Sequence, residues 1–152
     1  MKKLMMVVIF LTGALFTFSA TKSSEKPIPF EKLPKMAQEF IHTHFKGVNV
    51  VKCEVESPWT QFDVRMANGY DLEFDRSGNW TEIENEKGGI SSSILSVLPQ
   101  RTYSYLQSNY SGISVEKIER KKKGFKVTLN TRPEETELYF SNDGRFLNKK
   151  MD

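Results

Sequence analysis

The stretch LEFDRSGNW at residues 72–80 returns, slightly changed, as LYFSNDGRF at residues 138–146. In each copy apolar residues alternate with polar ones, which predicts a strand with one buried face. A turn segment with a glycine follows, and an aromatic residue closes the stretch. Each stretch is therefore expected to form a hairpin, and the second copy indicates an internal repeat.

The turn inside this stretch decides which residues face each other. Asp75 and Gly78 suit the first and fourth positions of a type I turn, which would place Phe74 opposite Trp80. We expect this aromatic pair, and its counterpart ending at Phe146, on the buried face. A competing two-residue turn would send Trp80 and Phe146 to the open face of the sheet.

The repeat extends upstream of the hairpins. The segment LPKMAQEFIHTHFKGV begins at Leu33 and LPQRTYSYLQSNYSGI begins at Leu98, and both have apolar residues at steps of three and four. That spacing predicts an amphipathic helix, which Gly47 and Gly112 would end. Strand-like alternation follows each helix. A unit of about 60 residues is marginal alone, so we expect the two units to share one sheet.

The predicted fold class is α+β. A helix plus a four-stranded antiparallel meander occurs twice, and the two units form one extended curved sheet with the helices on one face. The expected boundaries are a signal peptide at 1–20, an N-terminal linker at 21–32, a first repeat at 33–87 and a second at 88–152, the repeats forming one joint globular domain.

The signal peptide is predicted from the start of the chain. Lys2 and Lys3 precede the apolar run LMMVVIFLTGALF, and small residues lead to Ala20. This pattern is typical of export, with cleavage after Ser19 or Ala20. We therefore expect a periplasmic protein with no integral membrane segment after cleavage.

Charge and chemistry exclude several classes of function. The chain has 22 basic and 19 acidic residues, and losing Lys2 and Lys3 brings the net charge closer to zero, so a nucleic-acid partner is not expected. The single cysteine, Cys53, aligns with Ile118 of the other copy, which favours packing over reactivity. His42 and His44 point in different directions on a helix, so they predict no metal site. The sequence also contains no catalytic set, so no cofactor is predicted and we expect a protein that is not an enzyme.

A hairpin at the sequence MANGY defines the open face. A three-residue loop at 67–69 pairs Met66 with Tyr70 and keeps the apolar residues of both strands together. The polar residues between them then share the other face, which is the predicted binding face: Asp63, Arg65, Asp71 and Glu73 from the first repeat, and Lys126 and Tyr139 from the second. Arg65 would lie opposite Asp71, and Asp63 opposite Glu73.

These features together resemble a known family. The chain has an export signal and two helix segments that open with LP and continue with aromatic and aliphatic residues. Each helix segment is followed by a hairpin whose turn ends in an aromatic residue. In these features the chain is similar to the β-lactamase-inhibitor-like, PepSY-like periplasmic proteins of unknown function. The resemblance covers Leu33 to about Lys149, although the segment NTRPEETELYF at 130–140 replaces a short glycine turn. It implies tandem units and periplasmic location, and it implies no specific contact residues.

Two functions from different classes are compatible with the sequence. The first is a binding or inhibitory module that presents its open face and hairpin loops to another envelope protein. The second is a small-ligand or cation sensor that uses the acidic residues Asp63, Asp71, Glu73 and Asp75.

Overall fold

A computed structural model of the chain describes residues 24–152 apart from residue 57, so the expected signal peptide at 1–20 lies outside the described residues. The helices are α1 (Lys35–His44), α2 (Ser92–Leu95) and α3 (Gln100–Asn109), with a 3₁₀ turn η1 (Phe30–Lys32). The strands are β1 (Glu25–Pro27), β2 (Val50–Glu56), β3 (Gln61–Met66), β4 (Asp71–Asp75), β5 (Trp80–Glu84), β6 (Val115–Lys121), β7 (Gly124–Leu129), β8 (Thr136–Ser141) and β9 (Phe146–Met151).

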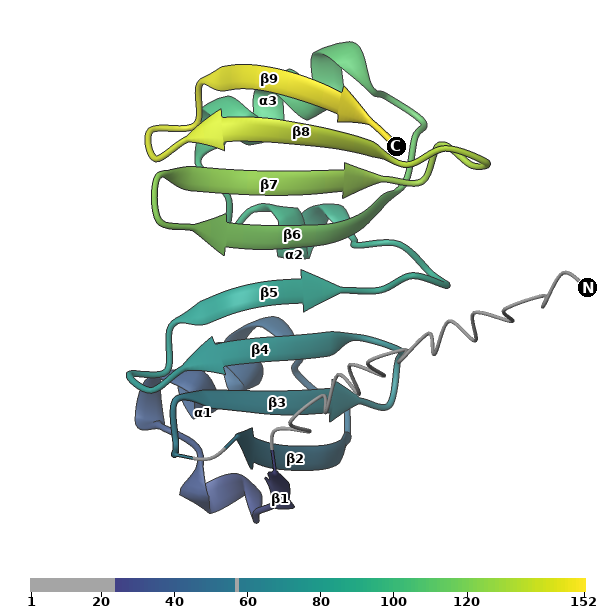
Figure 1. Cartoon of the computed structure of the whole chain (residues 1–152). Helices are drawn as coiled ribbons and strands as arrows, with labels where there is room; N and C mark the ends of the chain where they lie inside the picture. Colours follow the sequence, from purple (N-terminus) through teal and green to yellow (C-terminus); the bar gives the residue numbers. More distant parts are fainter. Residues whose placement is uncertain (1–23, 57) are drawn as a thin grey trace, which may run out of the picture.

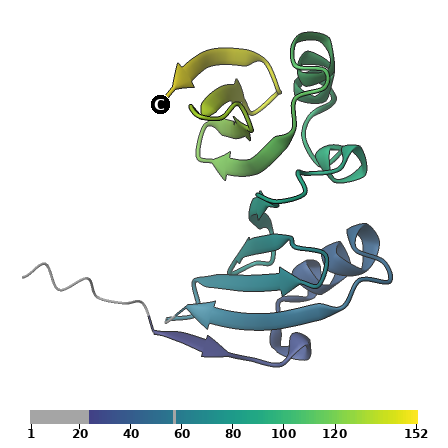
Figure 2. The ribbon, with the colours of Figure 1, turned by 90° about the vertical axis from the view of Figure 1, so that its right-hand side faces the viewer.

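Within this part of the chain the strands form one antiparallel sheet of nine strands, which lie in sequence order from β1 to β9 (Figure 1). All three helices pack on the same face of the sheet (Figure 2). The predicted α+β class, the single sheet and the one-sided helices are confirmed. Strand β1 was not predicted; it lies in the segment expected as a linker and pairs with β2 through Glu25 and Glu56.

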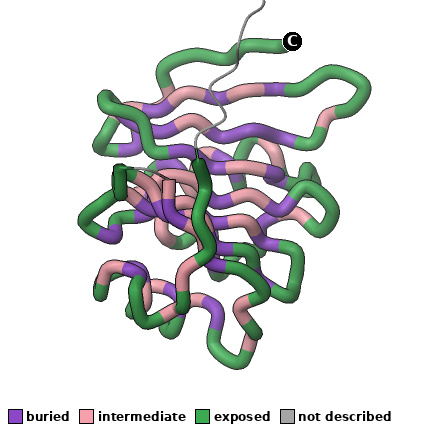
Figure 3. Tube along the Cα trace, turned by 60° about the horizontal axis from the view of Figure 1, so that its bottom comes forward, coloured by how far each residue is buried: buried purple, intermediate pink, exposed green. Residues whose placement is uncertain are grey.

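The hairpin registers agree with the sequence prediction. Phe62 pairs with Phe74 and Val64 with Leu72, and the amide of Met66 donates to the carbonyl of Tyr70 across the three-residue loop. Gly69 in that loop has φ of +91°, a conformation that favours glycine. Buried and less buried residues therefore alternate along the central strands (Figure 3).

The aromatic pairs of the two turn hairpins are also confirmed. Phe74 lies opposite Trp80 and Phe140 opposite Phe146, and Trp80 is only 6% exposed. Phe146 is half-buried, and its ring stacks on Tyr105 of α3 at 4.6 Å. The competing two-residue turn, which would have exposed both residues on the open face, is wrong.

The core lies between the helices and the sheet. Ala37 and Ile41 of α1 and Thr102 and Leu106 of α3 are buried against it. Cys53 is buried as well, consistent with a packing role. Met36, which shares the apolar spacing of Leu33 and Phe40 in the first helix segment, is instead 53% exposed.

The turn motif contains a glycine in both copies because the turn lies close to the start of a helix. Gly78 has φ of +89°, and a Cβ there would lie 2.8 Å from the amide nitrogen of Ala37. Gly144 has φ of +86°, and its Cβ would lie 2.7 Å from Cβ of Pro99. In each half the turn between two strands thus touches the start of a helix. A side chain at this position would push the helix away from the sheet.

We therefore expect Gly78→Ala to lower the free energy of unfolding by about 3 kcal/mol, from backbone strain and steric overlap together. Gly47→Ala is the matched control, since Gly47 has φ of +78° but nothing within 4 Å of the added Cβ. It should lose only the conformational part, about 1 kcal/mol. Urea unfolding measures both, and equal losses would refute the close-contact explanation.

Candidate binding face of the sheet

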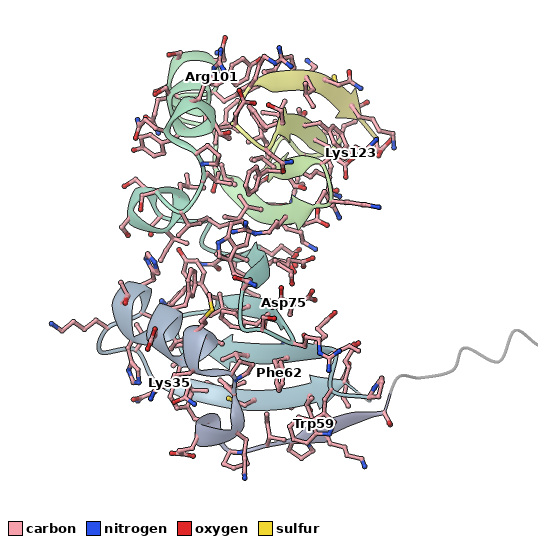
Figure 4. The ribbon with its side chains drawn as sticks, turned by 90° about the vertical axis from the view of Figure 1, so that its left-hand side faces the viewer. Lys35, Trp59, Phe62, Asp75, Arg101 and Lys123 are labelled. Carbon is pink, nitrogen blue, oxygen red and sulfur yellow. The ribbon has the colours of Figure 1, made fainter. Side chains whose placement is uncertain are left out.

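The face of the sheet opposite the helices is lined by polar side chains. The helices lie on the other side of the sheet, where α1 carries Lys35 and α3 carries Arg101 (Figure 4). Because side chains alternate across a strand, the six residues of the predicted binding face share this side, each lying between buried neighbours in β3, β4, β7 or β8. They are Asp63, Arg65, Asp71, Glu73, Lys126 and Tyr139.

Registers across adjacent strands place five carboxylates in one line, which we name the acidic row. Each of its members lies directly opposite the next, from β2 to β6. The acidic row consists of Glu54, Asp63, Glu73, Glu82 and Glu119. It continues across β7 and β8 as Lys126 and Tyr139, so four of the six predicted residues belong to this one line.

A second line, two residues along each strand, has mixed charge, and we name it the balanced row. Its members also pair directly across neighbouring strands. The balanced row consists of Lys52, Arg65, Asp71, Glu84, Lys117, Thr128, Glu137 and Lys150. The predicted pairing of Arg65 with Asp71 is confirmed as an exposed ion pair of 2.8 Å.

Cations contact the acidic row on both sides of its middle. Lys52 lies 2.7 Å from Glu54, Lys117 lies 3.0 Å from Glu82, and Lys121 lies 2.6 Å from Glu119. Oδ1 of Asp63 accepts a hydrogen bond of 2.9 Å from the side-chain Nε2 of Gln61. For Glu73, the described part of the chain provides neither a hydrogen bond nor an ion pair. The negative charge is therefore least compensated in the middle of the row.

The electrostatics follow this arrangement. Burial, then the charges of Glu82 and Asp63, raise the pKa of Glu73 to about 7. Burial also raises the pKa of Asp63, and the carboxylates of Glu56, Glu25 and Glu54 add to that effect. Like charges directly opposite one another destabilise a sheet. The row therefore favours anything that supplies positive charge or a proton.

Three carboxylates converge at the β1 end of the face. Oxygen atoms of Glu25, Glu56 and Asp63 all lie within 4.8 Å of one another. Oxygen ligands of this kind are the ones that Ca²⁺ prefers. Asp75, expected in the acidic set, has another role: its carboxylate accepts hydrogen bonds from the backbone amides of Ser77 and Asn79, which fixes the turn.

The second half of the face is neutralised internally. Nζ of Lys126 lies 2.7 Å from Glu119 and 2.9 Å from Glu137, and the hydroxyl of Tyr139 donates to Glu137 at 2.5 Å. Burial alone would lower the pKa of Lys126, but the two carboxylates outweigh it and raise that pKa. Lys126 and Tyr139 thus form a closed network and contribute little free charge.

Several residues of the face were missed from sequence. They are Glu25, Glu54, Glu56, Glu82 and Glu119. The alternation in β2 contains the signal for Glu54, whereas Glu82 follows a bulge that breaks the alternation between Trp80 and Ile83. Glu25 carried no signal, because strand β1 is three residues long and ends in proline.

Comparison with known proteins gives consistent results. A family model described as "Putative beta-lactamase-inhibitor-like, PepSY-like" matches residues 60–148. No curated protein sequence matches the chain. Among the described residues, no helix has the length and apolar character needed to span a membrane.

Several solved structures are similar over most of the chain. A protein from Bacteroides thetaiotaomicron, described as a "putative calcium-regulated periplasmic protein", is 32% identical, with a TM-score of 0.73, covering 83% of this chain and 96% of that one. A putative periplasmic protein from Bacteroides vulgatus is 31% identical, with a TM-score of 0.73, covering 85% and 98%. Another from the same species, of unknown function, is 32% identical, with a TM-score of 0.71, covering 83% and 98%.

The network around Lys126 yields a stability prediction. Lys126→Met removes the cation 2.7 Å from one oxygen of Glu119, which is 8% exposed, and leaves only Lys121, 2.6 Å from the other oxygen, so the free energy of unfolding should fall by about 2 kcal/mol at pH 7. Adding Glu119→Gln should restore part of the loss. Arg65→Met is the control: its ion pair with Asp71 is exposed, so its loss should change the stability little. Chemical denaturation checks all three, and equal effects of the two single variants would contradict the analysis.

Proposed function

This chain belongs to the "Putative beta-lactamase-inhibitor-like, PepSY-like" family, and we propose that it is a binding or inhibitory module of the cell envelope with a positively charged partner. It uses the open face of the sheet and the adjoining hairpin loops. The observation that carries the proposal is the acidic row, a line of directly opposed carboxylates whose middle has no cation in contact within the described residues. The family description refers to an inhibitor of an enzyme, which also favours a binding role over catalysis.

Location in the periplasm is part of this proposal. It is supported by the signal-peptide pattern of residues 1–20 and by relatives that are themselves described as periplasmic. The partner is then another protein of the envelope that presents lysine or arginine side chains. Within the binding face, Asp63 and Glu73 would meet those cations, while Arg65, Asp71, Lys126 and Tyr139 border them.

We also infer that the chain is a tandem duplication, with one unit at 33–87 and the other at 88–152. The support is that Gly78 and Gly144 occupy equivalent turns against the starts of α1 and α3. The face would then have diverged after duplication, because the acidic excess lies in the first unit and the closed network of Lys126 in the second.

A second candidate function is calcium sensing. It is favoured by the convergence of Glu25, Glu56 and Asp63 and by the relative described as calcium-regulated. Three carboxylates supply part of a calcium shell, and water would supply the remaining oxygen ligands. The two functions are compatible, since a bound cation would change the charge that a protein partner meets.

Affinity purification from periplasmic extract tests the binding function. Wild type should enrich a partner, and so should Glu39→Lys, a charge reversal at an exposed position of α1. The amount of that partner recovered with the double variant Asp63→Lys/Glu73→Lys should be at least tenfold lower. Loss of binding follows because lysines on the face would repel a basic surface. Thermal unfolding of each bait confirms folding. Equal recovery by all baits, or no enriched partner, would contradict the proposal.

Thermal shift after EDTA treatment tests calcium sensing. CaCl₂ at about 10 mM, which would saturate a weak extracellular site, should raise the Tm of wild type by a few degrees. Asp63→Asn should remove the shift because it removes a ligand. Asp71→Asn, outside the converging group, should retain it. A wild-type Tm that does not move, or an equal rise in Asp63→Asn, would rule this function out.

A further inference from the structure

The two units of the chain carry opposite excesses of charge. Residues 21–87 contain nine basic and twelve acidic side chains, whereas residues 88–152 contain eleven and seven. Four of these eleven are consecutive, at residues 120–123, where β6 turns into β7. With the expected signal peptide removed, the whole chain is close to neutral, so net charge does little to keep two copies apart. Separated charges of opposite sign then favour contact between unlike ends.

The tip of the β6–β7 turn presents two lysines to solvent. Lys121 lies opposite Gly124, which leaves Lys122 and Lys123 as the two exposed residues of the tip. Lys123 lies on the sheet side of the second unit, away from Arg101 of α3 (Figure 4). Within the described part of the chain, neither tip lysine has a hydrogen bond or an ion pair. Both ammonium groups are therefore available to a partner.

The base of the same turn is held in place. Cζ of Arg120 lies 4.6 Å from the centre of the Trp80 ring, and its Nε donates to the Trp80 carbonyl at 3.2 Å. Nζ of Lys121 lies 2.6 Å from Glu119. These contacts tie the turn to β5 and to its own strand, so presenting the tip requires little additional ordering on binding.

The open face of the first unit provides the complementary feature, which we name the acidic hollow. It has a volume of about 340 Å³ and is open to solvent. Among the described residues that line it, eight are carboxylates and two are cations, Lys52 and Arg65. Both cations are already paired, Lys52 with Glu54 and Arg65 with Asp71. None of these lining residues comes from the β6–β7 turn, so the lysines of the same copy do not fill the hollow.

We propose that a second copy of this chain occupies the acidic hollow by inserting Lys122 and Lys123 of its β6–β7 turn. The ammonium groups lie against Asp63 and Glu73, where the acidic row has the least positive charge, and donate charge-assisted hydrogen bonds to carboxylate oxygens. Because every copy has both the turn and the hollow, two copies related by a two-fold axis exchange turns and form a closed dimer.

Charge complementarity selects a second copy as the occupant. A phospholipid surface would satisfy the basic turn but not the acidic hollow, whereas a second copy satisfies both at once. The inference rests on the proposed function only in using the same face. The dimer would then regulate that face, because a basic envelope partner has to displace the turn of the second copy before it binds.

Sedimentation equilibrium of the purified protein tests the inference, in a buffer with EDTA that keeps divalent cations out of the hollow. Wild type should form dimers at about 50 mM NaCl and dissociate at about 1 M NaCl, where screening weakens charge contacts. Lys122→Glu/Lys123→Glu should weaken the dimer at least tenfold. Lys46→Glu/Lys87→Glu is the matched control, because it changes the net charge equally at two exposed positions, and it should dimerise like wild type.

A charge exchange separates this contact from general attraction. Asp63→Lys/Glu73→Lys should also be monomeric, because its hollow repels the lysines of the other copy. An equimolar mixture of this variant with Lys122→Glu/Lys123→Glu should form dimers again. In the mixture a basic turn meets an acidic hollow at one contact, and an acidic turn meets a basic hollow at the other. Recovery of the dimer also shows that both variants are folded.

The inference is overturned if wild type is monomeric at every concentration and salt, if the mixture does not recover the dimer, or if the control loses it equally. These outcomes leave the affinity test of the proposed function untouched. Lys122→Glu/Lys123→Glu keeps the acidic hollow and should still recover an envelope partner from extract. Recovery of further copies of this chain alone would support the inference and remove the separate envelope partner.

Discussion

Contact between a glycine turn and the start of a helix is the constraint on which this structure depends. Gly78 allows the β4–β5 turn to approach Ala37, and Gly144 allows the β8–β9 turn to approach Pro99 and Thr102. Each contact holds one helix against one side of the sheet, where the aromatic pairs complete the core. With α1 and α3 held on the same side, the opposite side of the sheet has no covering layer in the described part of the chain.

The same alternation that buries the core also determines the charge of the open face. Once Phe62 pairs with Phe74, Asp63 must lie opposite Glu73, and the bulge between β4 and β5 then brings Glu82 opposite Glu73 on the other side. Moving the register by one residue would bring Asp63 into the core. Like-charge pairs across strands each cost a few tenths of a kcal/mol or more. The fold therefore retains a cost that side-chain substitution could have removed without changing the backbone.

Much of the fold could be predicted from sequence, because period and turn chemistry are local signals. The hairpins at Gly69 and Gly78, the helices after Leu33 and Leu98 and the burial of Cys53 all followed from alternation and glycine placement. Strand β1 could not be predicted, because its three residues, which end in Pro27, are too few to show an alternating pattern. The strand is held by its pairing with β2. The acidic row was predicted only at Asp63 and Glu73. Its extension to Glu82 depends on the bulge between β4 and β5, and its extension to Glu119 depends on the pairing of β5 with β6, neither of which is visible in composition. Glu54 joins the row through the regular β2–β3 register.

The two rows of the open face allow one further step. The balanced row lies on the same strands and has the same pleat, yet it contains both signs of charge, so that Arg65 meets Asp71 and Lys117 meets Glu84, even though Lys52 faces Arg65 and Asp71 faces Glu84. This sheet can therefore neutralise a row of charges when nothing opposes it. Neither the backbone nor the need for solubility explains why its neighbour is acidic through five strands, since the balanced row is equally polar. Under the proposed function, the charge of Asp63 and Glu73 is what a cation or a basic partner would meet on this face.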